Sequence, residues 1–157
     1  MTVHLATGLA VLDGRVLLVA SRYPNHAVPL WNLPGGRQQS GELLTQTVAR
    51  EVEEETGLGV RVGSLAYVGE SYDGERHYLS ACFHVEVISA SSLDGAQHDG
   101  SDHVVGWEWV PLEALAERIV VGVVREPLLA YLRGELPQRY AGFHEAGITI
   151  EWPPDSA

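Results

Sequence analysis

The chain lacks several features that mark secreted and membrane proteins. It contains one cysteine, Cys82, so no intrachain disulfide can form and a reducing compartment is expected. No apolar run approaches the roughly 18 residues that a membrane helix requires. The first ten residues lack the basic start and long apolar core of a signal peptide. These absences predict a soluble, cytoplasmic protein that does not act at a membrane.

Positive charge is also scarce. Lysine and arginine number 10 against 21 aspartates and glutamates, giving a formal net charge of −11. Binding to a nucleic-acid polymer or to anionic lipid requires clustered cations, so neither is expected. The 157 residues, 45% of them hydrophobic, predict instead one folded domain.

Most of the chain has the short β-branched runs and turn residues of strands. Asp13-Gly14 is a type I′ turn signal, so residues 3–20 are expected to form one hairpin. Residues 21–36 contain three prolines and two glycines and are expected to form a loop, as is the polar segment 89–103. Further strands are expected at 60–62, 65–68, 78–88, 104–110 and 148–150, a short helix from Pro111, and a final helix over 127–133.

One segment has clear helical periodicity. Residues 42–56 contain no glycine or proline, and Leu44, Val48 and Val52 recur at i, i+4 and i+8. Gly57 follows as a left-handed C-terminal cap would. The apolar stripe is expected to anchor this helix on one face of the predicted strands, with the final helix on the other face.

The same helix carries four carboxylates in five positions. At about 100° per residue, Glu54 lies about 60° to one side of Glu51 and Glu55 about 40° to the other, whereas Glu53 lies on the far side. Like charges at these spacings repel. A hard divalent cation would offset that repulsion, and Arg50 could orient Glu54. The simpler interpretation is a solvated acidic face.

The residues around this helix resemble the complete signature of the Nudix hydrolase family. Gly36 is followed after five residues by Glu42 and after seven more by Arg50-Glu51-Val52-Glu53-Glu54-Glu55-Thr56-Gly57-Leu58, and Leu33-Pro34-Gly35 precedes it. Every specified position of the family motif is matched. The resemblance extends more loosely over residues 3–133, leaving 134–157 as a C-terminal extension of a single domain, 1–157.

The resemblance implies an α/β/α sandwich with a mixed β-sheet and a loop-helix-loop catalytic motif. It implies hydrolysis of a nucleoside diphosphate linked to another moiety, with Mg²⁺ or Mn²⁺. Glu51, Glu54, Glu55 and the carbonyl of Gly36 would hold the metal, and Arg50 would orient the carboxylates. One of the glutamates would act as general base. The family also suggests a further base or ligand from a later loop, where Asp102 and His103 are candidates.

Residues outside the motif determine which substrate is preferred. Trp31, Tyr72, His77 and Arg37 are candidates for binding a base, sugar or phosphate, although strand aromatics more often belong to the core. The small domain resembles the MutT-type members, which cleave nucleoside triphosphates, including oxidised dGTP, to monophosphate and pyrophosphate. Alternatives are a pyrophosphatase for ADP-ribose, nucleotide sugars or dinucleoside polyphosphates, a non-catalytic nucleotide sensor, and passive metal buffering. A homodimer is also expected from the resemblance.

Overall fold

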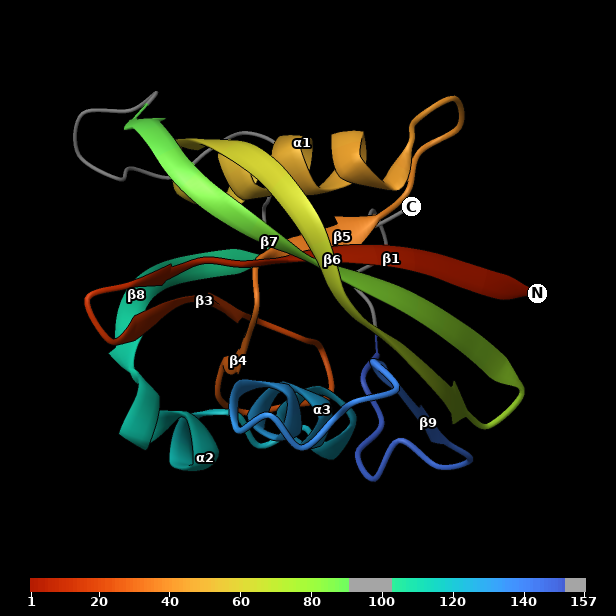
Figure 1. The fold of residues 1–157 in the computed structure, drawn as a ribbon. Helices are drawn as coiled ribbons and strands as arrows, with labels where there is room; N and C mark the ends of the chain where they lie inside the picture. Colours follow the sequence, from red (N-terminus) through yellow and green to blue (C-terminus); the bar gives the residue numbers. More distant parts are fainter. Residues whose placement is uncertain (91–102, 152–157) are drawn as a thin grey trace.

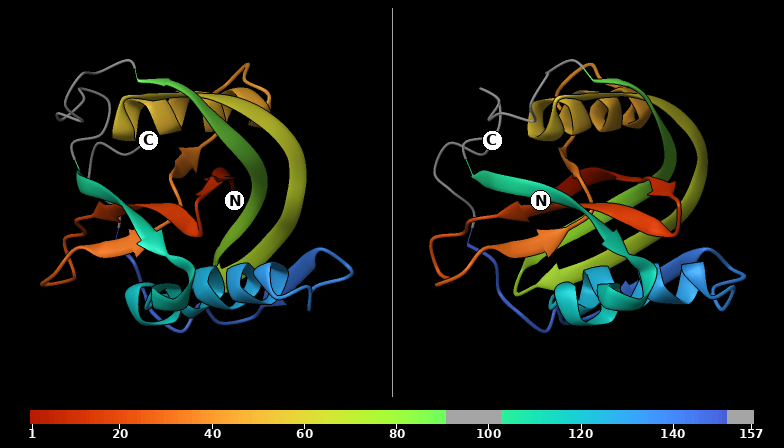
Figure 2. Two further views of the ribbon diagram at one scale, coloured as in Figure 1. Left: turned by 60° about the vertical axis from the view of Figure 1, so that its left-hand side comes forward. Right: turned by 90° about the vertical axis from the view of Figure 1, so that its left-hand side faces the viewer.

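In the computed structural model, which describes residues 1–90 and 103–151, helices cover two opposite sides of the strands (Figure 1). Helix α1 lies on one side, and α2 and α3 lie on the other; two turned views show the same layering (Figure 2). The strands are β1 Thr2–Leu9, β2 Val11–Leu12, β3 Arg15–Ser21, β4 Leu30–Asn32, β5 Gly35–Arg37, β6 Leu58–Asp73, β7 Arg76–Ala90, β8 Val104–Pro111 and β9 Tyr140–Phe143. The helices are α1 Leu44–Thr56, the 3₁₀ turn Leu112–Ala114, α2 Leu115–Arg118 and α3 Gly122–Leu132.

The strands form two sheets. The larger has the order β5-β1-β7-β6-β9 and is mixed, because β1 runs parallel to β7 and β6 parallel to β9 while the other pairs are antiparallel. In the smaller sheet β2, β4 and β8 all pair antiparallel with β3. This mixed α/β architecture confirms the predicted fold class.

The predicted hairpin over residues 3–20 is only partly correct. Asp13 and Gly14 both have positive φ, 51° and 73°, as a type I′ turn requires. The turn joins β3 to the two-residue β2, however, and β1 leaves to pair with β7 from Thr2 to Leu9. The chain thus changes sheets after Leu9, and local alternation carries no information about which distant strand a segment will pair with.

Residues 21–36 contain two short strands where a loop was predicted. Strand β4 pairs with β3, and β5 pairs with β1. The prolines lie beside these strands rather than within them: Pro29 precedes β4, and Pro34 separates β4 from β5. Gly35 permits the close approach, because a side chain there would collide with the backbone of Ala6 and Thr7.

Helix α1 forms as predicted. It ends at Thr56, and Gly57 follows in the left-handed conformation with φ 76°, its N–H donating to the carbonyl of Glu53 at 2.8 Å. Val48 and Val52 are fully buried in a core cluster with Ala6, Ala10, Leu17 and Val85, and Leu44 packs against its edge. The apolar stripe therefore fixes α1 on one face of the strands.

The C-terminal part departs from prediction in two places. Helix α3 begins at Gly122 rather than at Pro127, which lies buried inside the helix instead of at its first position. Residues 148–150 form no strand, and β9 instead adds Tyr140–Phe143 in parallel to β6. At Pro127 tertiary packing overrides the local signal, since Pro127 and Leu128 are both buried and Leu128 packs in a core cluster with strand residues.

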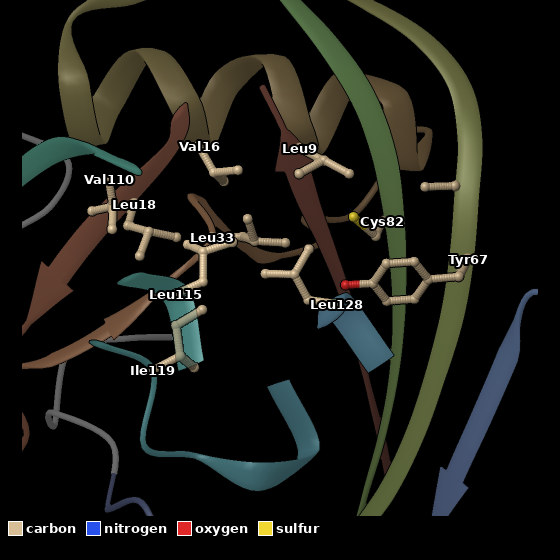
Figure 3. Packing of buried hydrophobic residues seen from close by; sticks show 11 residues of the cluster. Leu9, Val16, Leu18, Leu33, Tyr67, Cys82, Val110, Leu115, Ile119 and Leu128 are labelled. Carbon is tan, nitrogen blue, oxygen red and sulfur yellow. The ribbon is translucent and has the colours of Figure 1, made fainter. Parts of the chain in front are cut away.

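A second core cluster fills the space between the strands and α2 and α3. Tyr67 projects from β6 towards Cys82 and Leu128 (Figure 3). Leu115 and Leu128 are fully buried, with Leu129 and Leu132 at the edge, as expected. Cys82 is 1% exposed, and burial raises the pKa of its thiol to about 11. Among the helices of the described residues, none has the length and apolarity to cross a membrane.

Candidate active site

Three glutamates of α1 meet the β5 segment in one pocket. Glu51, Glu54 and Glu55 all line it, whereas Glu53 is exposed elsewhere on the helix. This division agrees with the one predicted from the helical angles. We call this the acidic pocket; its described lining consists of Leu5, Thr7, Val19, Ser21, Tyr23, Asn32, Leu33, Gly35, Gly36, Arg37, Gln39, Arg50, Glu51, Glu54, Glu55 and His103.

The three carboxylates are buried to different depths, which argues against the simpler interpretation of a solvated acidic face. The Glu54 side chain is 31% exposed and that of Glu51 is 14% exposed. Glu55 is 5% exposed, and its Oε1 accepts a hydrogen bond from the Gly35 N–H at 2.9 Å. The gradient places Glu54 closest to the solvent and Glu55 deepest.

Arg50 connects the acidic residues. Its Nη1 lies 2.6 Å from Oε1 of Glu51 and 3.2 Å from Oε2 of Glu54. Its Nε and Nη2 bind the two carboxylate oxygens of Glu42 at 2.6 and 3.0 Å, and Nη2 also donates to the carbonyl of Arg37 at 3.0 Å. The guanidinium thereby holds two pocket carboxylates in fixed orientations and joins α1 to the end of β5.

Glu42 has an anchoring position that the sequence reasoning did not single out. Besides the Arg50 guanidinium, its Oε1 accepts hydrogen bonds from the N–H of Gln39 and the hydroxyl of Thr47, at 2.9 and 3.0 Å. The hydrogen bonds from Arg50 lower the pKa of Glu42 to about 2. The available signal was its fixed place in the family motif, eight residues before Arg50.

Burial raises the pKa values of the two deeper carboxyl groups. Desolvation raises the pKa of Glu51 to about 7, against the lowering effect of Arg50, and raises that of Glu55 well above its ordinary value. The neighbouring carboxylates raise both further. A divalent cation is the natural counter-charge for such a group, because it would stabilise the ionised forms that burial disfavours.

The donor set fits a hard cation. The three carboxylates and the backbone of Gly36 offer oxygen ligands, and a Cβ at Gly36 would lie 2.5 Å from Oε2 of Glu51, so only glycine leaves this approach open. Within residues 1–90 and 103–151, however, no three acidic, histidine or cysteine side chains already converge tightly enough to hold a metal. Glu51 and Glu54 instead face Arg50.

The other predicted site residues divide into two groups. Arg37 and His103 line the acidic pocket. Trp31 does not; it packs against the core beside α3, with the Arg118 guanidinium 4.8 Å from its ring centroid.

Tyr72 and His77 stack on each other at the far end of the β6–β7 hairpin, with ring centroids 4.5 Å apart. Neither lines the acidic pocket. Asp102 lies outside the described residues.

A second pocket adjoins the acidic one and was not predicted. It is largely apolar, and five of its lining residues, Leu5, Thr7, Tyr23, Asn32 and Leu33, also line the acidic pocket. Its remaining lining comes from β6, β7, α3 and the segment after β9. We call it the apolar pocket; those remaining residues are Tyr67, Gly69, Glu70, Ser71, Asp73, Tyr78, Ser80, Val121, Val123, Val124, Pro127, Ala146, Ile148 and Ile150.

Comparison with protein-family models identifies the family of the chain. The model of the NUDIX domain matches residues 2–132, which includes α1, the Gly36 segment and both sheets except β9. The chain belongs to the Nudix family. The acidic pocket of this Nudix protein is therefore built on the family's own motif, and residues after 132, including part of the apolar pocket, lie outside the matched region.

Curated relatives of this Nudix protein carry different names. It is 40% identical over 152 residues to the nucleoside diphosphate-linked moiety X motif 6 protein of Xenopus laevis, covering 92% of this chain and 65% of the relative. It is 36% identical over 90 residues to an ADP-ribose pyrophosphatase of Methanocaldococcus jannaschii, covering 56% and 53%. It is 34% identical over 89 residues to a putative 8-oxo-dGTP diphosphatase of Bacillus subtilis, covering 53% and 51%. The matches thus span about half to two-thirds of these relatives.

Solved structures show the same fold. A NUDIX hydrolase from Nitrosomonas europaea superposes with a TM-score of 0.74, at 23% identity, covering 89% of this chain and 93% of that one. At this identity the likeness establishes the fold of the Nudix protein and not its substrate.

Proposed function

We propose that this Nudix protein is a metal-dependent hydrolase of a nucleoside diphosphate linked to another moiety, most specifically a MutT-type nucleoside triphosphate pyrophosphatase. One observation carries the proposal: a pocket lined by Glu51, Glu54 and Glu55 adjoins an apolar pocket, with which it shares five lining residues. The first has the donors for cations and phosphates, and the second has the apolar and aromatic surface for a nucleoside. Membership of the family supports the reaction class.

The carboxylates and the Gly36 carbonyl are the groups that would hold Mg²⁺ or Mn²⁺, in keeping with the family's general use of divalent ions. When bound, such ions neutralise developing phosphate charge and lower the pKa of water. Arg50 keeps Glu51 and Glu54 oriented through its bonds at 2.6 and 3.2 Å. The most exposed carboxylate, Glu54, is best placed to accept a proton from attacking water.

The substrate's two ends would occupy the two pockets. The phosphates would lie in the acidic pocket, where Arg37 and His103 supply polar contacts. The nucleoside would lie in the apolar pocket, whose lining includes Tyr23, Tyr67 and Tyr78. The five residues common to both pockets place the pockets side by side, which supports a substrate that occupies both.

Nucleoside triphosphates, including oxidised dGTP, are placed first because one nucleoside pocket beside the carboxylates is sufficient to bind them. The relative named as a putative 8-oxo-dGTP diphosphatase supports this choice. The alternative is a pyrophosphatase acting on ADP-ribose, a nucleotide sugar or a dinucleoside polyphosphate, which the relative named as an ADP-ribose pyrophosphatase supports. The single domain of residues 1–157 and the homodimer stay predictions.

The deciding experiment is a substrate panel with Mg²⁺ and Mn²⁺ and identification of products by mass. We expect nucleoside monophosphate and pyrophosphate from a nucleoside triphosphate. A nucleoside monophosphate with a phosphorylated second moiety would establish the alternative. Stoichiometric nucleotide binding without turnover would overturn the enzyme proposal in favour of a sensor, and stoichiometric cation uptake alone would indicate metal buffering. Hydrolysis in ¹⁸O-labelled water would then locate the attacked phosphorus.

A further inference from the structure

We propose that the segment after β9, residues 146–150, is a wall of the nucleoside-binding pocket and helps to select the substrate. The inference rests on the proposed function, because it takes the apolar pocket as the place of the nucleoside. Three residues of the segment, Ala146, Ile148 and Ile150, line that pocket. All three lie outside the region that the NUDIX model matches, residues 2–132.

The segment alternates between inward and outward positions. Ala146, Ile148 and Ile150 are half-buried, and Glu145, Gly147 and Thr149 are exposed. Ile148 and Ile150 pack against a small core cluster formed by Tyr23, Leu30 and Val121. This spacing presents apolar side chains to the pocket and polar groups to solvent, although the segment has no strand partner in the described structure.

Hydrogen bonds hold the segment across the turn that follows β3. The Thr149 carbonyl accepts from Nδ2 of Asn25 at 2.9 Å and lies 2.8 Å from Nε2 of His26. The Glu151 N–H donates to Oδ1 of Asn25 at 3.0 Å. On the β6 side, the Thr149 hydroxyl donates to Oδ1 of Asp73 at 3.3 Å. The segment is thus fixed at both sides of the apolar pocket, as a wall must be if it shapes a ligand.

The occupant that fits this wall is the nucleoside end of the substrate. The apolar pocket adjoins the acidic pocket and shares Tyr23 and Leu33 with it, and Ile148 and Ile150 pack in one cluster with Tyr23. A base needs flat or branched apolar contacts, which these side chains provide, whereas the phosphates are directed to the carboxylates. The wall should therefore affect how tightly a nucleotide binds and leave the chemical step unchanged.

The experiment compares Ile148→Ala and Ile150→Ala with Glu145→Ala, an exposed position of the same stretch. Steady-state kinetics are measured with dGTP, ATP and ADP-ribose in Mg²⁺. Each isoleucine substitution is expected to raise KM about tenfold for the substrates that the wild type cleaves, with kcat within twofold. The control is expected to match the wild type.

A second measurement separates the wall from general destabilisation. Inorganic pyrophosphate with Mg²⁺ reaches only the acidic pocket, so its inhibition constant should stay unchanged in the isoleucine variants. Should Ile148→Ala fail to fold, Ala146→Leu tests the same surface, because it fills the pocket without opening a cavity and should also raise KM.

Folded variants with wild-type KM for every nucleotide would overturn the inference while leaving the proposed function intact, and so would equal weakening of pyrophosphate and nucleotides. If the wild type cleaves no nucleotide, the proposed function fails. Calorimetric titration with dGMP and AMP then still decides the inference: weaker binding to Ile148→Ala supports it, and equal binding or none to the wild type overturns it.

Discussion

The two adjoining pockets are built in opposite ways. The acidic pocket takes its carboxylates from one helix and its close backbone contact from the strand just before it, all within residues 35–55. The apolar pocket is assembled from β1, β4, β6, β7, α3 and residues 146–150, which are far apart in sequence. Local sequence thus specifies the groups for chemistry, and long-range packing specifies the surface for recognition.

This difference separates two kinds of change. Arg50 contacts Glu42, Glu51 and Glu54 at once, so a substitution in the acidic pocket disturbs several partners. A substitution in the wall of the apolar pocket removes contact area and leaves those ion pairs in place. Substitutions in the first pocket should therefore act on kcat, and those in the second on KM.

The largest expected effect is removal of the divalent ion. With EDTA in excess we expect complete loss of nucleotide hydrolysis, because buried carboxylates without a cation cannot attract a polyphosphate. Pyrophosphate release is measured before and after Mg²⁺ is restored, and activity should return in full. Turnover that persists in EDTA would contradict the proposal that the acidic pocket binds a catalytic metal ion.

Next in size is Glu54→Gln, for which we expect kcat to fall roughly 10²- to 10⁴-fold, the range typical of a general base. The side chain is 31% exposed, so the midpoint of thermal unfolding should change little. Glu53→Gln is the matched control, since Glu53 is an exposed glutamate of the same helix outside the pocket. If both variants lose activity equally, the predicted division of the helix faces is wrong.

Gly36→Ala tests the backbone contribution to the same pocket. The added Cβ would lie 2.5 Å from the Glu51 carboxylate, so Glu51 must move. We expect roughly a 10²-fold loss of kcat, as is usual when a reacting group shifts by about an ångström. Gly106→Ala is the control, because no atom lies within 4 Å of a Cβ there. Wild-type kinetics in Gly36→Ala would show that catalysis does not depend on the close contact between the Gly36 backbone and Glu51.

Proton competition gives a smaller, graded effect. Burial raises the pKa of Glu51 to about 7 in the metal-free protein, and a metal ligand must be ionised. The affinity for Mg²⁺ should therefore fall at least about tenfold per pH unit below pH 7, since Glu55 must also lose its proton, and calorimetry in two buffers should detect proton release on binding.

In the metal-free protein the free energy of unfolding changes with pH in the direction opposite to the Mg²⁺ affinity. Because the folded pKa lies above the ordinary value of 4.5, the contribution of Glu51 is present at low pH and is lost as pH rises through 7. Mg²⁺ should restore that loss, as measured by thermal unfolding. A Mg²⁺ affinity that is flat between pH 6 and 8 would contradict the raised pKa.

The smallest effect is expected in the apolar pocket, from Val123→Ala. This half-buried side chain of α3 lines the pocket, and losing two methyl groups should raise KM for the nucleotide several-fold with kcat unchanged. Val120→Ala is the control, since Val120 is 51% exposed and does not line the pocket. A fall in kcat instead of a rise in KM would mean that the two pockets are not separable.

The parts of the molecule that sequence predicted well are those whose cause is local. The i, i+4 spacing of Val48 and Val52 and the cap at Gly57 determine α1, and one helix turn determines which glutamates share a face. The depth of Glu55 was not predictable, because it depends on Gly35 and the strands behind it. The spacing of residues in a helix gives the direction of each side chain about the helix axis, but it does not show which other segments cover that side chain.

The parts that were missed depend on pairing between distant segments. Strand β1 was assigned to the wrong partner, and β9 was not predicted at all, because its ladder forms with β6 about 70 residues earlier. Trp31 was a candidate because it lies in a loop-like stretch beside the family motif, yet it belongs to β4 and packs beneath Arg118. A single sequence does not show which aromatic ring faces a ligand.

The buried cysteine of the second core cluster has a practical consequence. Cys82 is 1% exposed and its thiol is hard to ionise, so alkylating reagents should leave it unmodified while the chain stays folded. A cysteine introduced at an exposed position could then carry a fluorophore as the sole label. The rate at which Cys82 itself is modified would then measure how often the core opens and exposes this thiol.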